Sequence, residues 1–299
     1  MKRKTVIIAV MAPVCLILAA IFAAGWIFSS NLLHSPARCY PAHVYCGDPS
    51  NLGLEYKDIG IETSDGVALK GWLIPAANSR KLVVFVHGHS ATRNAGLRYA
   101  RALHDAGFNY LLCGLRGSLK DKGKAVFSMG FHEQKDIRAM VDCAVKDLKM
   151  ESVGIMGFSM GASASIVAMA EDPRIRAGAF NSGFSNVRKQ LADRANSRYG
   201  LPAFPFIDIV LLLASVRGSI DFDVINPEDY IGKIAPRPVF IFHSAKDPEV
   251  GIEHARLLFE KAGEPKLLWE VPWPGHTAEW NNGKEESERR IVKFFKDSM

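Results

Sequence analysis

The chain has 299 residues, enough for one large folded domain, and 48% of them are hydrophobic while 23% are charged. This composition excludes a collagen-like or low-complexity polymer. Half of the formal net charge of +6 comes from Lys2, Arg3 and Lys4. Charges of both signs alternate along the rest of the chain, which argues against nucleic acid as a partner.

The chain begins with an uncharged apolar run at 6–28, 23 residues long. A helix of this length can cross the ~30 Å hydrocarbon layer of a bilayer. The basic residues before it predict a cytoplasmic N-terminus and place the rest of the chain in the periplasm or outside the cell. We therefore interpret residues 1–29 as a single-pass signal anchor in the membrane.

A leader that is removed is the alternative to an anchor. The small residues at 23–25 could be accepted by a signal peptidase, and the product would then be secreted. A lipid-modified leader at Cys15 is a further variant, although Val14 fits lipidation poorly.

Residues 30–50 contain three prolines and no helical or strand period, and are predicted to be a linker. Cys39 and Cys46 are close enough in sequence to close a small disulfide loop in an oxidising compartment. Cys113 and Cys143 lie in apolar patterns and are predicted to be reduced core residues.

Strand and helix patterns alternate through residues 51–299, which predicts one domain with a mostly parallel sheet covered by helices on both faces. The predicted strands lie at 67–74, 82–86, 109–113, 153–157, 175–180, 238–242 and 267–271. The predicted helices lie at 95–106, 131–148, 160–171, 250–262 and 284–297. A turn at 64–66 indicates an antiparallel pair at one edge of the sheet.

An insertion at about 184–232 interrupts this alternation. It contains the apolar stretch Leu201 to Val216, whose 16 residues are too few for a second membrane span. The insertion is either a lid whose apolar face binds an acyl chain or touches lipid, or a buried pair of helices.

The sequence Gly157-Phe158-Ser159-Met160-Gly161 follows a predicted strand and precedes a predicted helix. A G-x-S-x-G motif in this context is typical of a nucleophile elbow, in which a sharp turn exposes the serine hydroxyl and small residues avoid collisions with the backbone. We therefore predict Ser159 to be a catalytic nucleophile.

A serine nucleophile needs a base to take its proton and a carboxylate to orient that base. His276 follows the strand predicted at 267–271 and is the expected base. Asp247 follows the strand predicted at 238–242 and is the expected acid. Glu249 is the main competitor for the role of the acid, and Asp223 in the insertion is a remote one.

The oxyanion of the tetrahedral intermediate needs preorganised donors. The predicted donors are the backbone N–H groups of Met160 and His89. His87 and His89 could suggest a metal pair, but no carboxylate or cysteine cluster accompanies them at ligand spacing. No phosphate loop or dinucleotide fingerprint is present, so no cofactor and no metal are predicted.

These motifs resemble the α/β-hydrolase superfamily over residues 54–299. His87-Gly88 is similar to its oxyanion loop and Lys246-Asp247 to its acid turn, and the segment from Ala170 to Ala177 with Asn181-Ser182 resembles membrane-anchored serine hydrolases of the peptidase S33-like or acyl-thioesterase-like kind. The resemblance implies an eight-stranded sheet, a triad of Ser159, Asp247 and His276, and an acyl-enzyme formed from an ester, thioester or amide.

Two positions depart from the pattern of the superfamily. The segment Arg116 to Lys120 lacks a second glycine, and His243 is followed by Ser244 where glycine is usual. Neither is a predicted triad residue, so these departures concern the shape of the substrate more than the reaction.

The leading hypothesis is a membrane-tethered serine hydrolase acting on a small-molecule or lipid acyl substrate, with carboxylesterase, lipase or thioesterase activity favoured over peptidase activity. The alternatives are a catalytically silent binding protein with the same fold, and an acyltransferase that uses the same triad. The sequence does not indicate the acyl chain length or the oligomeric state.

Overall fold

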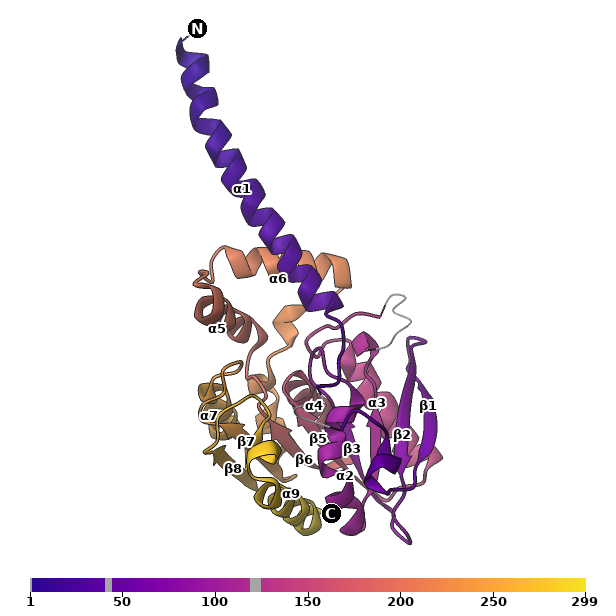
Figure 1. The fold of residues 1–299 in the computed structure, drawn as a ribbon. Coiled ribbons are helices and arrows are strands. Elements are labelled where there is room, and N and C mark those ends of the chain that lie inside the picture. Colours follow the sequence, from indigo (N-terminus) through magenta and orange to yellow (C-terminus); the bar gives the residue numbers. More distant parts are fainter. Residues whose placement is uncertain (1, 41–44, 119–124) are drawn as a thin grey trace.

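A computed structural model describes residues 2–40, 45–118 and 125–299. Its centre is an eight-stranded sheet in the order β1-β2-β4-β3-β5-β6-β7-β8 (Figure 1). The strands are β1 (Lys57–Glu62), β2 (Ala68–Ile74), β3 (Lys81–Val86), β4 (Asn109–Cys113), β5 (Ser152–Phe158), β6 (Ile175–Asn181), β7 (Val239–Ser244) and β8 (Lys266–Val271).

The predicted strands are confirmed as β2 to β8, and the predicted mostly parallel sheet is confirmed. Only the β1–β2 and β2–β4 pairs are antiparallel, whereas every other neighbouring pair is parallel. Strand β1 lies at the sheet edge and was not among the predicted runs. Of its residues only Ile61 is buried, so its sequence lacks the apolar pattern that marks the other strands.

Helices cover both faces of the sheet and create two hydrophobic cores. Helices α2 (Leu97–Asp105) and α9 (Lys284–Ser298) pack on one face, whereas α3 (Glu133–Asp142), α4 (Met160–Glu171) and α7 (Ile252–Lys261) pack on the other. Strand β3 shows the reason, because Leu82 and Val84 face one core while Val83 and Phe85 face the other. Both faces of the strand are therefore apolar, as the sequence predicted.

Two smaller helical pieces complete the elements around the sheet. Helix α3 continues into a π-helical turn at Cys143–Asp147, and together they account for the single helix predicted at 131–148. The short helix α8 (Glu279–Asn282) precedes α9 and follows the loop that carries His276.

The carboxyl ends of the central strands meet at one edge of the sheet. Val86 of β3 pairs with Gly157 of β5, Phe158 pairs with Asn181 of β6, and Asn181 pairs with Phe242 of β7. The loops that follow these strands are therefore neighbours, although they are far apart in sequence. In open α/β sheets such an edge is the usual position of a binding site.

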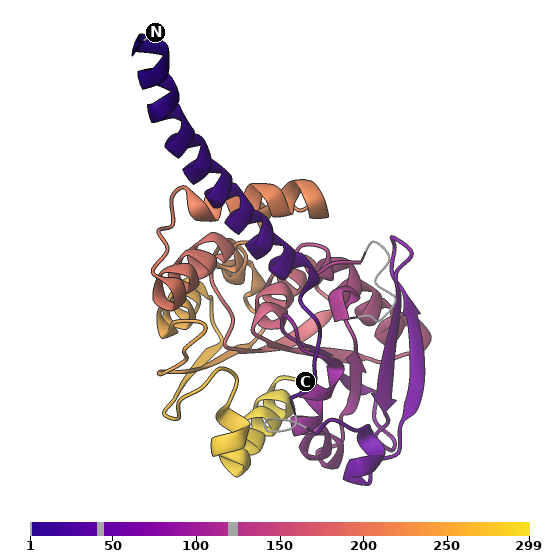
Figure 2. The same cartoon turned by 45° about the horizontal axis from the view of Figure 1, so that its top comes forward.

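The insertion between β6 and β7 contains helices α5 (Val187–Tyr199) and α6 (Phe206–Gly218). Helix α6 contains most of the apolar stretch noted at 201–216. Both views show α6 crossing the N-terminal helix α1 beyond the carboxyl edge of the sheet (Figures 1 and 2). The insertion therefore covers the edge at which the loops converge.

Helix α1 (Lys2–His34) extends away from the domain, while its last turns lie against α6 (Figure 2). Its segment Cys15–His34 is long and apolar enough to cross a membrane, with a mean hydropathy of 2.0. The helix continues beyond residue 29, where the sequence placed the start of a linker. Residues of this last part, including Leu33, are buried in the domain, which explains why the helix does not end with the apolar run.

Cys39 and Cys46 form a disulfide, as the sequence suggested. Cys113 and Cys143 are buried and reduced, as predicted. Residues 41–44 of the predicted linker and residues 119 and 120, which end the Arg116 to Lys120 segment, lie outside the described residues.

Candidate active site

Ser159 stands in the sharp turn between β5 and α4, with φ 53° and ψ −123°. Its backbone N–H donates a hydrogen bond of 2.8 Å to the carbonyl of Asn181 in β6. A Cβ at position 161 would collide with the carbonyl oxygen of Val86, and one at 157 would collide with that of Gly161. The two glycines therefore allow the first turn of α4 to press against the strands, which holds Ser159 in this strained conformation.

The predicted oxyanion loop lies beside this serine. A Cβ built on Gly88 would be 3.1 Å from the Cβ of Ser159 and 3.7 Å from its Oγ, so glycine permits the close approach of the backbone. Met160 is the first residue of α4, and its N–H has no acceptor within the helix. The structure thus brings the loop at 88–89 and the N-terminus of α4 to the same serine, while the donor roles of His89 and Met160 stay predictions.

The side chains of His87 and His89 hold this loop in place. The buried His87 ring accepts from the N–H of Leu115 at 2.9 Å and donates to the carbonyl of Gly88 at 2.8 Å. Burial lowers the pKa of His87 to about 4, so the ring stays neutral. His89 donates from Nε2 to the carbonyl of Leu32 in α1 at 2.8 Å. These rings link the loop to the segment after β4 and to the N-terminal helix.

His276 and Asp247 are paired. Nδ1 of His276 donates to Oδ2 of Asp247 at 2.8 Å, while Oδ1 accepts from the N–H groups of Glu249 and Val250 at 2.8 and 3.0 Å. The Asp247 side chain is fully buried. Burial by itself would raise the pKa of Asp247, but its hydrogen bond with His276, the charge of His276 and the two backbone donors together lower it.

The two competing carboxylates lie elsewhere. Glu249 forms ion pairs with Arg194 at 2.7 Å and Arg198 at 3.3 Å, both from α5. Asp223 follows α6 in a short turn of the insertion and lines a separate cavity near Arg188. Asp247 is therefore the carboxylate that the structure joins to His276.

A buried arginine outside the set of predicted site residues joins the serine and histidine loops. Arg98 of α2 donates a hydrogen bond to the carbonyl of Thr277, next to His276. Its guanidinium also lies 4.7 Å from the ring centre of Phe158, next to Ser159. The adjacent Tyr99 donates to the buried carboxylate of Glu279 at 2.8 Å. The sequence did contain a signal for Arg98, because this arginine lies on the apolar face of the predicted helix at 95–106. An arginine is rarely buried without a specific partner.

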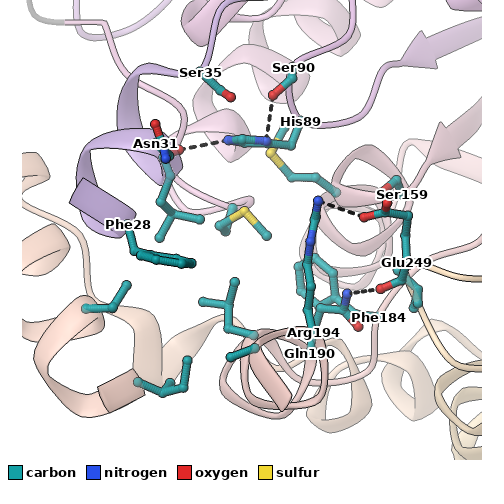
Figure 3. A pocket seen from close by; sticks show the side chains of 18 of the residues that line it. Phe28, Asn31, Ser35, His89, Ser90, Ser159, Phe184, Gln190, Arg194 and Glu249 are labelled. Carbon is teal, nitrogen blue, oxygen red and sulfur yellow. Dashed lines mark hydrogen bonds and ion pairs between the residues drawn. The ribbon is translucent and has the colours of Figure 1, made fainter. Parts of the chain in front are cut away.

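Ser159 and His276 both line two cavities, which share part of their lining. The smaller, of about 230 Å³, is lined mainly by apolar side chains of α1, α5 and α6 (Figure 3). The larger, of about 690 Å³, is lined by more polar residues, including Arg38, Arg98 and Arg194. A substrate bound at Ser159 would thus have an apolar and a cationic cavity within reach.

No group of three or more potential metal ligands occurs among the described residues, those outside 1, 41–44 and 119–124. The rings of His87 and His89 bond to backbone groups and to the hydroxyl of Ser90, at 2.9 Å from Nδ1 of His89. Their arrangement therefore differs from that of a metal pair.

A solved esterase structure is similar to this chain over most of its length. The Pyrococcus furiosus esterase Pf2001 superimposes with a TM-score of 0.71 and 27% identity, over 89% of this chain and 98% of the esterase. The chain belongs to the α/β-hydrolase superfamily. The family described as serine aminopeptidase, S33, matches residues 77–206 of this α/β hydrolase.

Two uncharacterized bacterial proteins are also similar to this α/β hydrolase. YqkD of Bacillus subtilis is 26% identical over 242 residues, which cover 80% of this chain and 78% of YqkD. YfhR of Escherichia coli strain K12 is 24% identical over 236 residues, covering 77% and 75% respectively. The family match and the esterase structure support a hydrolase role.

Proposed function

We propose that this α/β hydrolase is a membrane-tethered serine esterase that forms an acyl-enzyme on Ser159. The observation that carries the proposal is the joint position of the strained Ser159 and the His276–Asp247 pair on the wall of the same cavities. A serine, an imidazole and a buried carboxylate in this arrangement are the components of a nucleophilic triad.

In the first half of the reaction, Oγ of Ser159 attacks the carbonyl carbon of the ester. Nε2 of His276 takes the serine proton, because its Nδ1 is committed to Asp247. The negative oxygen of the tetrahedral intermediate accepts hydrogen bonds from the N–H groups of Met160 and His89. When the intermediate collapses, the bond to the leaving alcohol breaks, and His276 gives its proton to that alcohol.

In the second half, a water molecule attacks the acyl-enzyme and His276 takes its proton. The second tetrahedral intermediate uses the same donors and releases the carboxylic acid, and the proton returns to Oγ of Ser159. Throughout, Asp247 stays ionised and stabilises the positive charge that forms on His276, which its lowered pKa favours.

An ester substrate is favoured over a peptide with a free amino terminus. An aminopeptidase would need an unpaired carboxylate near the serine to bind the ammonium group of its substrate. Glu249 is the only carboxylate among the described residues that line the two cavities, and Arg194 and Arg198 already pair with it. The cationic character of the larger cavity would repel an ammonium group.

The apolar helix α1 supports the membrane tether, with the N-terminus in the cytoplasm and the domain on the other side. Residues after the small-residue segment at 23–25 pack on the domain, and Phe28 contacts both Tyr199 and Phe206. Gly25 within that segment also packs against Ile209 of α6 as part of the helix, so the segment is not the exposed, flexible chain that a peptidase prefers. This packing supports an anchor that is retained.

A fluorophosphonate probe tests the proposal, because it reacts with activated serines. The wild-type protein in detergent should be labelled and should hydrolyse p-nitrophenyl butyrate, whereas Ser159→Ala should lose the labelling and about 10³-fold or more of the activity. Ser197→Ala, on the exposed side of α5, is the matched control and should behave as wild type. Labelling that persists in Ser159→Ala would refute the proposal.

A further inference from the structure

The end of the N-terminal helix lies in the wall of the candidate active site. The cavity of about 230 Å³ that contains Ser159 and His276 is also lined by Phe28, Asn31 and Leu32 of α1. Figure 3 shows Phe28 and Ser159 on opposite sides of this pocket. A segment that a simple tether would leave outside the domain therefore faces the candidate nucleophile.

The remainder of this pocket is formed mainly by apolar side chains. They come from the two helices of the insertion and from the loops and helix start around the serine: Met129, Met160, Phe184, Leu191, Ala195, Tyr199, Phe206, Ile207, Val210 and Val250. Charged groups among the lining residues are confined to Arg194 and Glu249, which pair with each other at 2.7 Å. An uncharged hydrocarbon chain is the ligand that such a lining favours.

Several contacts fix the last turns of α1 in this wall. Gly25 lets α6 approach closely, since a Cβ there would be 2.7 Å from the Cγ2 of Ile209. The ring of Phe28 packs edge-on against the rings of Tyr199 and Phe206, with distances of 5.2 and 5.1 Å between ring centres. Arg217 donates to the hydroxyl of Ser29 at 2.7 Å. Together with the His89–Leu32 bond described above, these contacts make the end of α1 part of the folded domain.

With the proposed tether in the bilayer, a span that ends at Trp26 would place this wall at the membrane surface. The uncharged residues between Lys4 and Trp26 span about 30 Å as a helix, the thickness of the hydrocarbon layer. Arg217 lies over the ring of Trp26 at 4.0 Å, and tryptophan and arginine are both typical of the headgroup region. The pocket therefore begins where the membrane span ends.

The outer face of α6 continues this apolar surface. Leu212 and Val216 are 63% and 75% exposed, and Phe204 just before the helix is 79% exposed. Helix α6 is thus apolar on both its buried and its exposed face, and it crosses the membrane helix (Figure 2). An exposed apolar surface of this kind beside a membrane span fits contact with the bilayer.

We propose that the α1–α5–α6 pocket binds the acyl chain of a fatty-acyl ester drawn from the bilayer, and that the last turns of α1 determine the preferred chain length. The leaving group then occupies the larger, cationic cavity, which Ser159 also lines. This inference rests on the proposed esterase function and names its substrate class. Under this proposal, the N-terminal anchor is a component of the binding site as well as a tether.

The test compares p-nitrophenyl acetate, butyrate and octanoate as substrates of the full chain in detergent. Wild type should have a higher kcat/KM for octanoate than for acetate. Phe28→Ala removes one apolar wall that the longer chain would contact. It should therefore lower the octanoate-to-acetate ratio of kcat/KM about tenfold, because each methylene group in a hydrophobic pocket contributes to discrimination. Ile27→Ala is the matched control, since Ile27 is 58% exposed on the same turn.

The outcomes separate this inference from the proposed function. An octanoate-to-acetate ratio in Phe28→Ala equal to that of wild type, with Ser159-dependent hydrolysis intact, would overturn the acyl pocket and leave the esterase proposal standing. The absence of any Ser159-dependent hydrolysis would overturn both. If Phe28→Ala does not fold, Phe28→Leu keeps the site apolar and should shift the ratio in the same direction by a smaller factor.

Discussion

Nδ1 of His276 donates a hydrogen bond of 2.8 Å to Oδ2 of Asp247, and this bond joins the loops after β8 and β7. Because the other carboxylate oxygen is held by two backbone N–H groups, Asp247 cannot rotate without losing them. The bond therefore fixes both the tautomer and the orientation of the imidazole, and leaves Nε2 outside that bond, as the proposed base requires.

Asp247→Asn tests this relationship. The amide can no longer accept the Nδ1 proton as a carboxylate does, so we expect kcat to fall by a factor on the order of 10⁴. Glu249→Gln should have a far smaller effect, because Glu249 contacts Arg194 and Arg198 and not the histidine. Steady-state hydrolysis of p-nitrophenyl butyrate measures both variants. Equal losses in the two would show that the acid has been misassigned.

Arg98→Ala should impair catalysis without removing a group that contacts the substrate carbonyl. Arg98 connects the backbone beside His276 to the ring beside Ser159, so its loss should let the two loops separate. A displacement of about 1 Å can cost about 10²-fold in rate. We expect kcat to fall by up to that factor, while the pH dependence of kcat keeps its shape because His276 and Asp247 remain.

The matched control for Arg98 is Arg101→Ala, on the exposed side of the same helix. It should leave kcat within about twofold of wild type, as surface substitutions usually do. Arg98→Lys should rescue little of the activity, because an ammonium group cannot both reach the carbonyl of Thr277 and stack on Phe158 as a planar guanidinium does. Full rescue by lysine would argue that charge alone matters at this position.

Gly161→Ala should destabilise the protein and abolish its activity. The added methyl group would meet the carbonyl oxygens of Val86 and His87, which belong to the backbone and cannot rotate away. We expect a loss of about 1–3 kcal/mol or more in the free energy of unfolding. Gly60→Ala, on the exposed strand β1 with open space around it, should change this free energy by about 0.5 kcal/mol or less. Thermal unfolding in detergent compares the two.

Because His87 is buried and neutral, we expect acidification to lower the free energy of unfolding. In the unfolded chain this histidine takes up a proton near its ordinary pKa of 6.5, whereas in the folded protein burial lowers the pKa to about 4. Between these values the unfolded state binds more protons, so stability falls as the pH falls from about 6.5 toward 4. The loss from this residue between pH 7.5 and pH 5 is about 2 kcal/mol.

The melting temperature at the two pH values measures this effect, and His87→Gln should reduce the difference between them. His104→Gln, at a partly exposed position of α2, should leave the difference as it is in wild type. A protein whose melting temperature does not fall on acidification would show that His87 is protonated in the folded state.

Local signals in the sequence predicted most of the fold. Strands β3 to β7 are covered on both faces and therefore have continuous apolar runs, and α4 begins at Met160 as predicted because the elbow and its glycines mark the boundary. The turn at 64–66 correctly predicted an antiparallel pair at the sheet edge, but the bounds of β1 escaped prediction because a solvated strand needs little apolar pattern. The order of Ser159, Asp247 and His276, each after a strand, placed all three at one edge of the sheet.

Chain order alone could not decide between Asp247 and Glu249, because the two side chains are separated by one residue and only the direction of each carboxylate distinguishes them. Nor could it reveal Arg98, whose partners are distant in sequence. The same holds for the end of α1. Its apolar residues suit a lipid bilayer and a protein pocket equally well, so composition determined that the helix is apolar, and only the packing of α1 against α6 placed Phe28 opposite Ser159.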